Sequence, residues 1–488
     1  ATAEVSGPGF VNLTVDDAVL AAAVTAIAGD ARLGVPRARE PQRVVVDYSA
    51  PNVAKDLTVG HLRSTVIGDA AARVLEWLGH DVVRANHLGD WGTSFGMLIE
   101  HLITTDAPET LGAKELTAAY QAARERFAAD AAFADSARQR VVLLQGGDAV
   151  TRAWWERLVA GSRRHLLTAY ERLGVTLTEG DFAGESTYQG QLASVVEELD
   201  AKGLLTESDG ALCAFPAGFT GRDGGPLPLI VRKGDGGFGY AATDLAALRH
   251  RTGQLGAARM LYVVGAPQRT HLAMVFAVAR AAGWLPAHVR AEHVAFGSIL
   301  GADGKMFRTR AGGTVALDDL LDEAVTRASV LAGDPAVAAA VGTGAVKYAD
   351  LGSDRRGDYV FDWDRMLALT GNTGPYLQYA YARISSLLDR AGPFTPAVTL
   401  TEDAERALAR ELLAFEPIVT GVGESLEFHR LAGYLYGLAA QFSTFYESCP
   451  VLRAPDGVRE SRLTLCLLTG RTLRRGLDLL GIATPARL

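Results

Sequence analysis

The sequence has few cysteines and no long apolar run. Its three cysteines, Cys213, Cys449 and Cys466, lie far apart along the 488 residues. An odd number at such spacing makes neither a CxxC metal site nor a disulfide framework, and it indicates a reducing, cytoplasmic setting. No uninterrupted apolar run approaches the roughly 18 residues of a membrane-spanning helix. The first residues, ATAEVSGPGF, carry neither the basic nor the apolar region of a signal peptide.

The composition is that of a soluble globular protein. Apolar residues make up 48% of the chain and charged residues 21%, proportions typical of folded domains. The length predicts about three domains of roughly 150 residues each. The net charge of −8 argues against a protein that coats nucleic acid along its whole surface, although it does not exclude a local basic patch that binds it.

Residues 43–68, RVVVDYSAPNVAKDLTVGHLRSTVIG, are the stretch around which we organise the prediction. The valines at 44–46 are typical of a buried strand, which Pro51 ends. From Gly60 apolar residues recur at helical spacing, which predicts a helix that stops near Gly79. A helix N-terminus directly after a strand binds phosphates through its free backbone N–H groups and its dipole, and Lys55 and His61 add donors there.

The rest of the chain alternates helices and strands to about residue 320 and then reads as helical. Helical periodicity appears at 16–34 and 113–200. The segment 207–215 reads as a hairpin that turns at Asp209-Gly210. Further strands are expected in the segments 6–15, 82–87, 227–251, 260–272 and 293–315. Tyr240 and Asp244, four residues apart on a predicted helix, project from the same face.

Several blocks of this sequence resemble one enzyme family. PNVAKDLTVGHLRS is similar to the adenylate-forming signature of class I aminoacyl-tRNA synthetases, in the form used by arginyl-tRNA synthetases, and HLGDWGTSFGMLIEHL is similar to the segment that follows it. GNTGPYLQYAYARI resembles the anticodon-binding domain of that family. The resemblance covers residues 6–488. It implies an α/β Rossmann-like class I catalytic domain with a helical insertion, followed by an all-α anticodon-binding domain.

The resemblance divides the chain into three parts. Residues 1–42 are expected to be a remnant of the N-terminal domain that contacts tRNA in the family; a simple strand and helix without such a role is an equal alternative. Residues 43–340 are the expected catalytic domain, with a connective insertion at about 105–205. Residues 341–488 are the expected helical anticodon-binding domain.

The activity implied by the resemblance is that of an arginine–tRNA ligase in protein biosynthesis. It takes L-arginine, tRNA(Arg) and ATP with Mg²⁺. The family motifs carry nucleotide binding onto Thr58, Gly60, His61 and Lys305, and catalysis onto Lys55, His61 and Lys305. Attack of a carboxylate on the α-phosphate needs positioning and charge neutralisation more than covalent help.

Two departures from the family pattern fall in this nucleotide-binding set. Thr58 stands where the usual signature has His, and a hydroxyl can hydrogen-bond a phosphate but carries no charge. The class I KMSKS loop is present only as the degenerate GKMFRTR at 304–310. Many arginyl-tRNA synthetases share this degeneracy and carry a Lys before the signature, so Lys55 is expected to supply the lost charge.

The arginine pocket can be predicted from the chemistry of its ligand. A guanidinium is planar and always charged, so its pocket should offer carboxylates with an aromatic or amide partner. The family's arginine-binding positions correspond here to Asp47, Asn52, Tyr240, Asp244 and Gln268. We expect Tyr240 and Asp244 to bind the guanidinium, and Asn52 and Gln268 to orient the amine and carboxylate. Without the resemblance, Tyr240 and Asp244 would read as a surface pair.

The residues expected to contact tRNA lie in the C-terminal part. The resemblance points to Tyr376, Gln378, Tyr379, Arg471 and Arg475. The two arginines share one helix face, which a solvated surface explains about as well as phosphate binding does. We expect a cytoplasmic monomer without a bound metal of its own and without a membrane partner.

Two other functions remain open at this point. One is a synthetase paralogue with a changed role: a self-resistance copy, a tRNA-dependent amide-forming enzyme or a regulator. Thr58 and the short N-terminal part motivate it. The other is a non-catalytic module that binds tRNA or a nucleotide.

Overall fold

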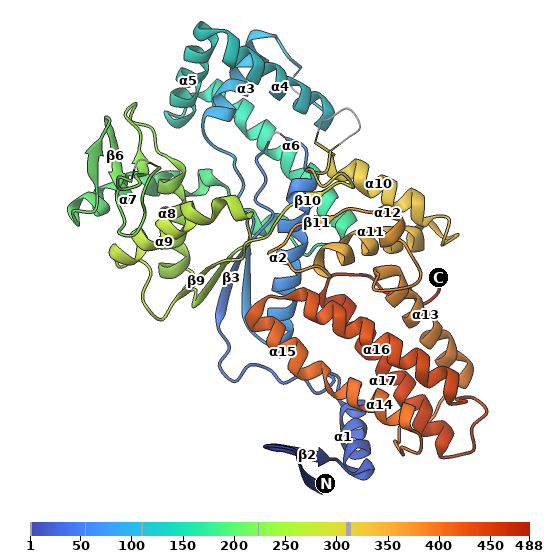
Figure 1. Cartoon of the computed structure of the whole chain (residues 1–488). Helices are drawn as coiled ribbons and strands as arrows, with labels where there is room; N and C mark the ends of the chain where they lie inside the picture. The colour runs from blue at the N-terminus through green and yellow to red at the C-terminus, as the bar shows by residue number, and fades with distance from the viewer. Residues whose placement is uncertain (1, 54, 109–110, 223, 309–313) are drawn as a thin grey trace.

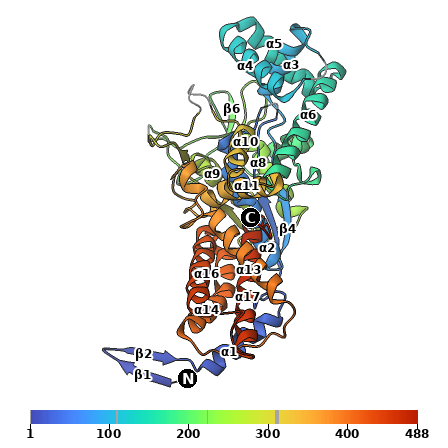
Figure 2. The same ribbon diagram turned by 90° about the vertical axis from the view of Figure 1, so that its right-hand side faces the viewer.

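A computed structural model describes residues 2–53, 55–108, 111–222, 224–308 and 314–488. A parallel sheet lies between a helical insertion at one end of the molecule and a bundle of C-terminal helices toward the other (Figure 1). The N-terminal hairpin projects at the far end of the bundle, as Figure 2 shows from the side. The molecule is therefore elongated, with the sheet close to its middle.

The sheet contains four parallel strands in the order β4-β3-β8-β9. Its strands are β3 (Arg43–Asp47), β4 (Asp81–Ala85), β8 (Arg259–Tyr262) and β9 (Arg290–His293). Side chains alternate along β3, so that Val44 and Val46 enter one core and Val45 enters a second core on the opposite face. The strand order reverses between β3 and β8, and open α/β sheets bind ligands outside the carboxyl ends of their strands at such a point. This topology confirms the predicted Rossmann-like fold.

Helices cover both faces of this sheet. The first core contains α2 (Val59–Trp77), and the second contains α7 (Gln189–Ala201), α8 (Tyr240–Gly253) and α9 (Arg269–Ala281). The predicted stop of α2 is confirmed, because Gly79 has a φ of 90°, a left-handed conformation that favours glycine. Each βα unit therefore places a helix N-terminus at the carboxyl edge of the sheet.

A second, antiparallel sheet holds the predicted hairpin. It consists of β5 (Thr206–Ser208), β6 (Ala211–Ala214) and β7 (Leu229–Arg232). Asp209 and Gly210 both have positive φ, 49° and 74°, as the predicted tight turn requires. The strand expected to begin near residue 293 is different: β9 ends there, with His293 as the last residue that pairs with β8, opposite Tyr262. The short strand β10 (Ile299–Leu300) follows, and it pairs with β11 (Tyr359–Val360).

The helical insertion has a core of its own. Its helices are α3 (Thr93–Thr104), α4 (Ala113–Ala129), α5 (Ala131–Gln145) and α6 (Ala149–Leu173). Met97, Ala123, Phe133 and Ala137 are buried between α3, α4 and α5. The predicted helical stretch 113–200 is thus broken, since residues 174–188 form a loop with two short turns before α7 joins the sheet.

The C-terminal half is helical, as predicted, with one short strand. Its helices are α10 (Leu317–Ala328), α11 (Pro335–Leu351), α12 (Trp363–Met366), α13 (Gly374–Ala391), α14 (Asp403–Leu413), α15 (Phe415–Ser425), α16 (Phe428–Ser448) and α17 (Val458–Leu479). The expected boundary between residues 340 and 341 falls inside α11, which packs on both α2 and α13. The catalytic and helical parts therefore share one continuous core.

The N-terminal residues form a hairpin and a helix: β1 (Thr2–Ser6), β2 (Phe10–Thr14) and α1 (Asp17–Gly29). The predicted strand after the glycine turn and the predicted helix are both present. Helix α1 packs on α14 and α17, so this segment is anchored to the C-terminal bundle and not to the sheet.

Candidate active site

The N-terminus of α2 opens at the carboxyl edge of the sheet. The loop between β3 and α2 is held by backbone hydrogen bonds from Val53 N–H to the Gly89 carbonyl, at 3.0 Å, and from Val59 N–H to the Val315 carbonyl, at 3.1 Å. Gly60 is exposed in the first turn. Among the described residues a Cβ built on Gly60 would meet only Thr58 Oγ1, at 3.4 Å. The space above this turn is open, as a phosphate-binding turn requires.

His61 is oriented by Thr58, which caps α2. The backbone N–H of Thr58 donates to His61 Nδ1 at 3.0 Å, and Thr58 Oγ1 lies 3.1 Å from the same nitrogen. Because Nδ1 accepts a hydrogen bond, the ring proton is assigned to Nε2. Burial lowers the pKa of His61, and the charge of Lys55 lowers it further. The ring is therefore neutral at neutral pH and offers Nε2–H as a donor.

Two predicted cations come from different segments. Lys55 is half-buried, and its Nζ lies 4.4 Å from the ring centroid of Tyr120 in the insertion. Lys305 is exposed on the turn after β10, where its carbonyl accepts from Gly301 N–H at 2.7 Å. The chain then returns to the start of α2, because Thr58 and Ala316 form a β-bridge. Residues 309–310 of the GKMFRTR motif lie outside the described residues.

Tyr240 and Asp244 lie one turn apart at the start of α8, as predicted. Asp244 Oδ2 lies 2.6 Å from His271 Nε2, and this hydrogen bond raises the pKa of His271. Tyr240 is 76% exposed. Burial of its hydroxyl, with the nearby Glu185 and Tyr120, raises the pKa of Tyr240. Tyr120 thus contacts Lys55 and also acts electrostatically on Tyr240.

Glu185 is a site residue that the sequence reasoning missed. Burial, followed by the charges of Asp244 and Asp90, raises the pKa of Glu185 to about 8. Asp90 is fully buried, accepts hydrogen bonds from Ser186 N–H at 2.9 Å and Ser186 Oγ at 2.7 Å, and has its pKa raised by burial. Asp90 and Asp244, which come from separate segments, thus act electrostatically on Glu185, and Glu185 in turn acts on Tyr240. No periodicity marks Glu185, which lies in a loop, and only its position among the other acids identifies it.

Asp47, at the end of β3, already has a cationic partner. Arg251 Nη2 lies 2.7 Å from Asp47 Oδ2, and both side chains are buried. Burial alone would lower the pKa of Arg251, but Asp47 and the neighbouring tyrosines raise it well above its ordinary value. The other carboxylate oxygen, Asp47 Oδ1, is buried and has no hydrogen-bond partner among the described residues.

Asn52 and Gln268 follow neighbouring strands of the sheet. Asn52 lies after β3, is exposed and forms a β-bridge with Gly89, whose missing Cβ leaves room for the Asn52 amide. Gln268 is exposed in the turn between β8 and α9. Since β3 and β8 pair directly, both amides lie at the reversal point of the strand order.

A second candidate site is a cleft of about 360 Å³ in the helical part. It is lined by Tyr379, Arg383, Arg390, Phe442, Tyr446, Arg487 and the C-terminal Leu488. The guanidinium of Arg383 lies 5.7 Å from the ring of Tyr379 and 5.4 Å from that of Tyr446. Tyr376 is half-buried, and its ring lies 5.7 Å from that of Tyr436. Exposed aromatic rings beside arginines suit unpaired bases and phosphates.

Three predicted tRNA contacts have structural partners instead. Gln378 is fully buried, and its Nε2 donates to the carbonyls of Ala340 and Ala483 at 3.0 and 2.8 Å. Arg471 donates to the carbonyls of Ala28 and Asp30, which joins α17 to the end of α1. Arg475 pairs with Asp478 at 2.7 Å and lies 4.0 Å above the ring of Trp77. Gln378 and Arg471 thus use donors in structural contacts, whereas Arg475 is half-buried and pairs within its own helix. Contact of these three residues with tRNA stays a prediction.

Two absences can be stated for the described ranges. They contain no cluster of three or more His, Cys, Asp or Glu side chains that could hold a metal ion. None of their helices combines the length and the apolar character needed to cross a membrane.

Comparison with known proteins gives consistent matches over the whole chain. Residues 23–363 match the family model of tRNA synthetases class I (R), catalytic domain, and residues 377–488 match the DALR anticodon binding domain. The arginine–tRNA ligase of Thermobifida fusca (strain YX) is 54% identical over 503 residues, covering 99% of this chain and 87% of that protein. That of Frankia casuarinae is 52% identical over 506 residues, covering 99% and 86%.

Solved structures agree. The arginyl-tRNA synthetase from Plasmodium falciparum superposes with a TM-score of 0.84 at 29% identity, covering 100% of this chain and 86% of that chain. The arginyl-tRNA synthetase of Thermus thermophilus gives a TM-score of 0.84 at 26% identity, covering 100% and 88%.

Proposed function

This chain belongs to the class I tRNA synthetase (R) family, and on that premise we propose how its residues perform the reaction. It is an aminoacyl-tRNA ligase that activates L-arginine with ATP and transfers it to the 3′ end of tRNA(Arg). The observation that carries the residue assignment is the start of α2, where Thr58 N–H holds His61 Nδ1 at 3.0 Å and the turn at Gly60 stays open, together with Tyr240 and Asp244 one turn apart at the start of α8.

In the activation step a carboxylate oxygen of arginine attacks the α-phosphate, and the bond to the leaving pyrophosphate breaks. The Nε2–H of His61 and the first-turn N–H groups near Gly60 donate to the phosphate oxygens. Lys55 and Lys305 supply positive charge, and Thr58 keeps His61 in place through its cap. Mg²⁺ held by the phosphates neutralises further charge when it is bound. The 3′-terminal ribose hydroxyl of tRNA then attacks the arginyl carbonyl, and AMP leaves.

The arginine side chain binds between Tyr240 and the acids Asp244 and Glu185. Its guanidinium offers five donors in a plane, and two carboxylates on one side satisfy them. His271 is hydrogen-bonded to Asp244, so a bound guanidinium competes with this imidazole for the carboxylate. Asn52, Gln268 and the unpaired Oδ1 of Asp47 orient the backbone amine and carboxylate.

We assign recognition of the tRNA anticodon to the cleft around Tyr379 and Arg383. Tyr376 lies on the same helix as Tyr379, and we propose that it contacts tRNA next to this cleft. We also propose that the protein acts as a monomer in the cytoplasm, which sedimentation of the purified protein and fractionation of cells would test.

The activity is tested by incubating the protein with ATP, radiolabelled arginine and tRNA. Arginyl-tRNA should form, and AMP and pyrophosphate should appear in equal amounts. An absence of arginyl-tRNA above background, with folded protein, would reject the proposed function.

The assignment of the guanidinium pocket is tested with Asp244→Ala. Loss of a charged acceptor should raise the arginine KM about 10- to 100-fold, with the ATP KM within about twofold. Asp200→Ala, at the exposed end of α7, is the matched control and should change neither constant. Equal increases in both KM values would show that Asp244 has a structural role.

A further inference from the structure

Tyr120 brings the helical insertion into contact with the nucleotide-binding loop. Its ring lies 4.4 Å from the ammonium of Lys55, and both side chains are half-buried. Burial alone would raise the pKa of the Tyr120 hydroxyl, but hydrogen bonds with Lys55 and Ser94 lower it. The ring of Tyr120 therefore contacts Lys55, and its hydroxyl interacts with both Lys55 and Ser94. Ser94 lies in the first turn of α3, which begins at Thr93.

The side chain of Tyr120 is held in place by its packing in the insertion. It projects from α4 and packs against the small core of Met97, Ala123 and Phe133. An aromatic side chain on a packed helix loses little further freedom when it makes a contact. Lys55, by contrast, lies in a loop and has a flexible four-carbon stem with many rotamers. A fixed ring beside its ammonium removes much of that freedom before any ligand arrives.

Tyr120 also acts on the proposed amino acid pocket. It contributes to the raised pKa of Tyr240, which responds to burial and to Glu185 as well. Tyr120 therefore contacts the cation proposed for the phosphate and influences the aromatic side chain proposed for the guanidinium. A change at Tyr120 can therefore affect the binding of ATP without removing the carboxylates that are proposed to bind arginine.

We propose that Tyr120 is a positioning residue that holds the Lys55 ammonium against its ring face, in the position from which Lys55 meets the phosphates of ATP. The assignment rests on the proposed function, because Lys55 has this role only if ATP is the substrate. The contact with Lys55 comes from the helical insertion and not from the sheet. The insertion therefore takes part in nucleotide binding through Tyr120.

The test compares Tyr120→Leu, which removes the ring, with Tyr120→Phe, which keeps it. Tyr120→Leu should raise the ATP KM about tenfold, the size expected when a partly desolvated cation–π contact is lost, with the arginine KM within twofold. Tyr120→Phe should remain within threefold of the parent for ATP. Phe133→Leu perturbs the same small core without touching Lys55 and serves as the control: its Tm should fall, but its ATP KM should not change.

A double-mutant cycle with Lys55→Met separates positioning from packing. In the Lys55→Met background Tyr120→Leu should change the ATP KM by less than twofold. Additive effects, a tenfold loss in Tyr120→Phe, or a lower ATP KM in Tyr120→Leu would each overturn the proposal; the last would mean that the ring withholds Lys55 from the nucleotide. If Tyr120→Leu unfolds, Tyr120→Met, whose unbranched side chain adapts to an irregular gap, takes its place. Failure of the parent protein to form arginyl-tRNA would instead reject the proposed function.

Discussion

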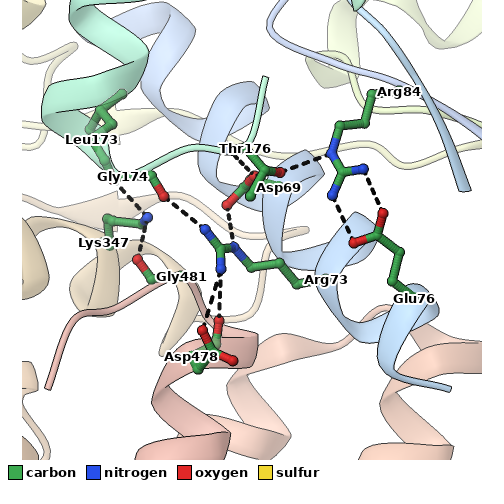
Figure 3. Close-up of polar contacts among 10 residues, drawn as sticks. All are labelled: Asp69, Arg73, Glu76, Arg84, Leu173, Gly174, Thr176, Lys347, Asp478 and Gly481. Carbon is green, nitrogen blue, oxygen red and sulfur yellow. Dashed lines mark hydrogen bonds and ion pairs between the residues drawn. The ribbon is translucent and has the colours of Figure 1, made fainter. Parts of the chain in front are cut away.

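The two parts of α2 differ in how their polar groups are satisfied. In the first turn Gly60 is exposed, and His61 Nε2 remains as a donor after Nδ1 has bound Thr58. Two turns further on, Asp69 and Arg73 are paired with each other at 2.7 Å (Figure 3). Asp69 Oδ1 also accepts from Thr176 N–H at 2.7 Å. One helix therefore carries a ligand-facing end and a structural middle.

The middle of α2 joins this helix to α6, α11 and α17. Arg73 Nη2 donates to the Gly174 carbonyl at 2.9 Å after α6, and the Lys347 ammonium of α11 donates to the carbonyls of Leu173 and Gly481 (Figure 3). Burial lowers the pKa of Lys347 to about 8 against the charge of Asp69. Burial would raise the pKa of Asp69, but Lys347 and Arg73 lower it. Charges in this cluster compensate one another, whereas the first turn offers uncharged hydrogen-bond donors such as His61 Nε2–H.

The largest expected effect is on stability, at Asp69. Asp69→Ala leaves Lys347 as a buried cation without its counter-charge and leaves Arg73 only the longer pair with Asp478, at 3.5 Å, and it should lower the free energy of unfolding by about 3–5 kcal/mol. Urea unfolding measures this. Asp81→Ala breaks the exposed pair with Arg43, whose side chains are 49% and 56% exposed, and should cost less than about 1 kcal/mol. Equal losses in both variants would contradict the comparison.

The second effect is on catalysis, at the other end of the helix. His61→Ala removes a donor to the reacting phosphate and should lower kcat by about 100-fold, or ~2.7 kcal/mol. Its free energy of unfolding should change by only about 1 kcal/mol, the contribution of a lost cap. Single-turnover adenylate formation with bound tRNA and urea unfolding measure the two quantities. A stability loss as large as that of Asp69→Ala would remove the distinction between the two parts of α2.

The smallest effect is a pH dependence at Glu185. With a raised pKa of about 8, Glu185 is mostly protonated in the free enzyme below that pH, and a bound guanidinium favours the carboxylate. Arginine binding should therefore release a proton, and the arginine KM should rise by up to about tenfold as pH falls from 8 to 7. Glu185→Gln should abolish this dependence. A parent KM that is flat across this range would show that Glu185 does not face the substrate.

Candidate site residues were predictable from the sequence where their partners are close along the chain, and not where the partners are distant. The strand, loop and helix around Gly60 were predictable because their signals are local: a valine run, a proline and apolar residues at helical spacing. Tyr240 and Asp244 were predictable as a pair because four residues make one helical turn. Glu185 was not, because its raised pKa depends on Asp90 and Asp244, which the fold brings in from other segments.

Gln378, Arg471 and Arg475 show what residue type alone does not reveal. Their places in family-like segments suggested contacts with RNA, but Gln378 and Arg471 donate to carbonyls from distant parts of the chain, and Arg475 pairs with Asp478 one turn away and lies over Trp77. A donor that is already satisfied in the interior is not available to a ligand.

The amino-acid sequence by itself determined the alternation of strands and helices, the turn at Gly60 that is proposed to bind phosphate, and the family of the chain, since these depend on neighbours in sequence. Only the tertiary structure decided which polar groups are free to bind. Whether a side chain meets a substrate, as Asp244 is proposed to do, or a carbonyl of a distant helix, as Arg471 does, depends on contacts across hundreds of residues that no local pattern records.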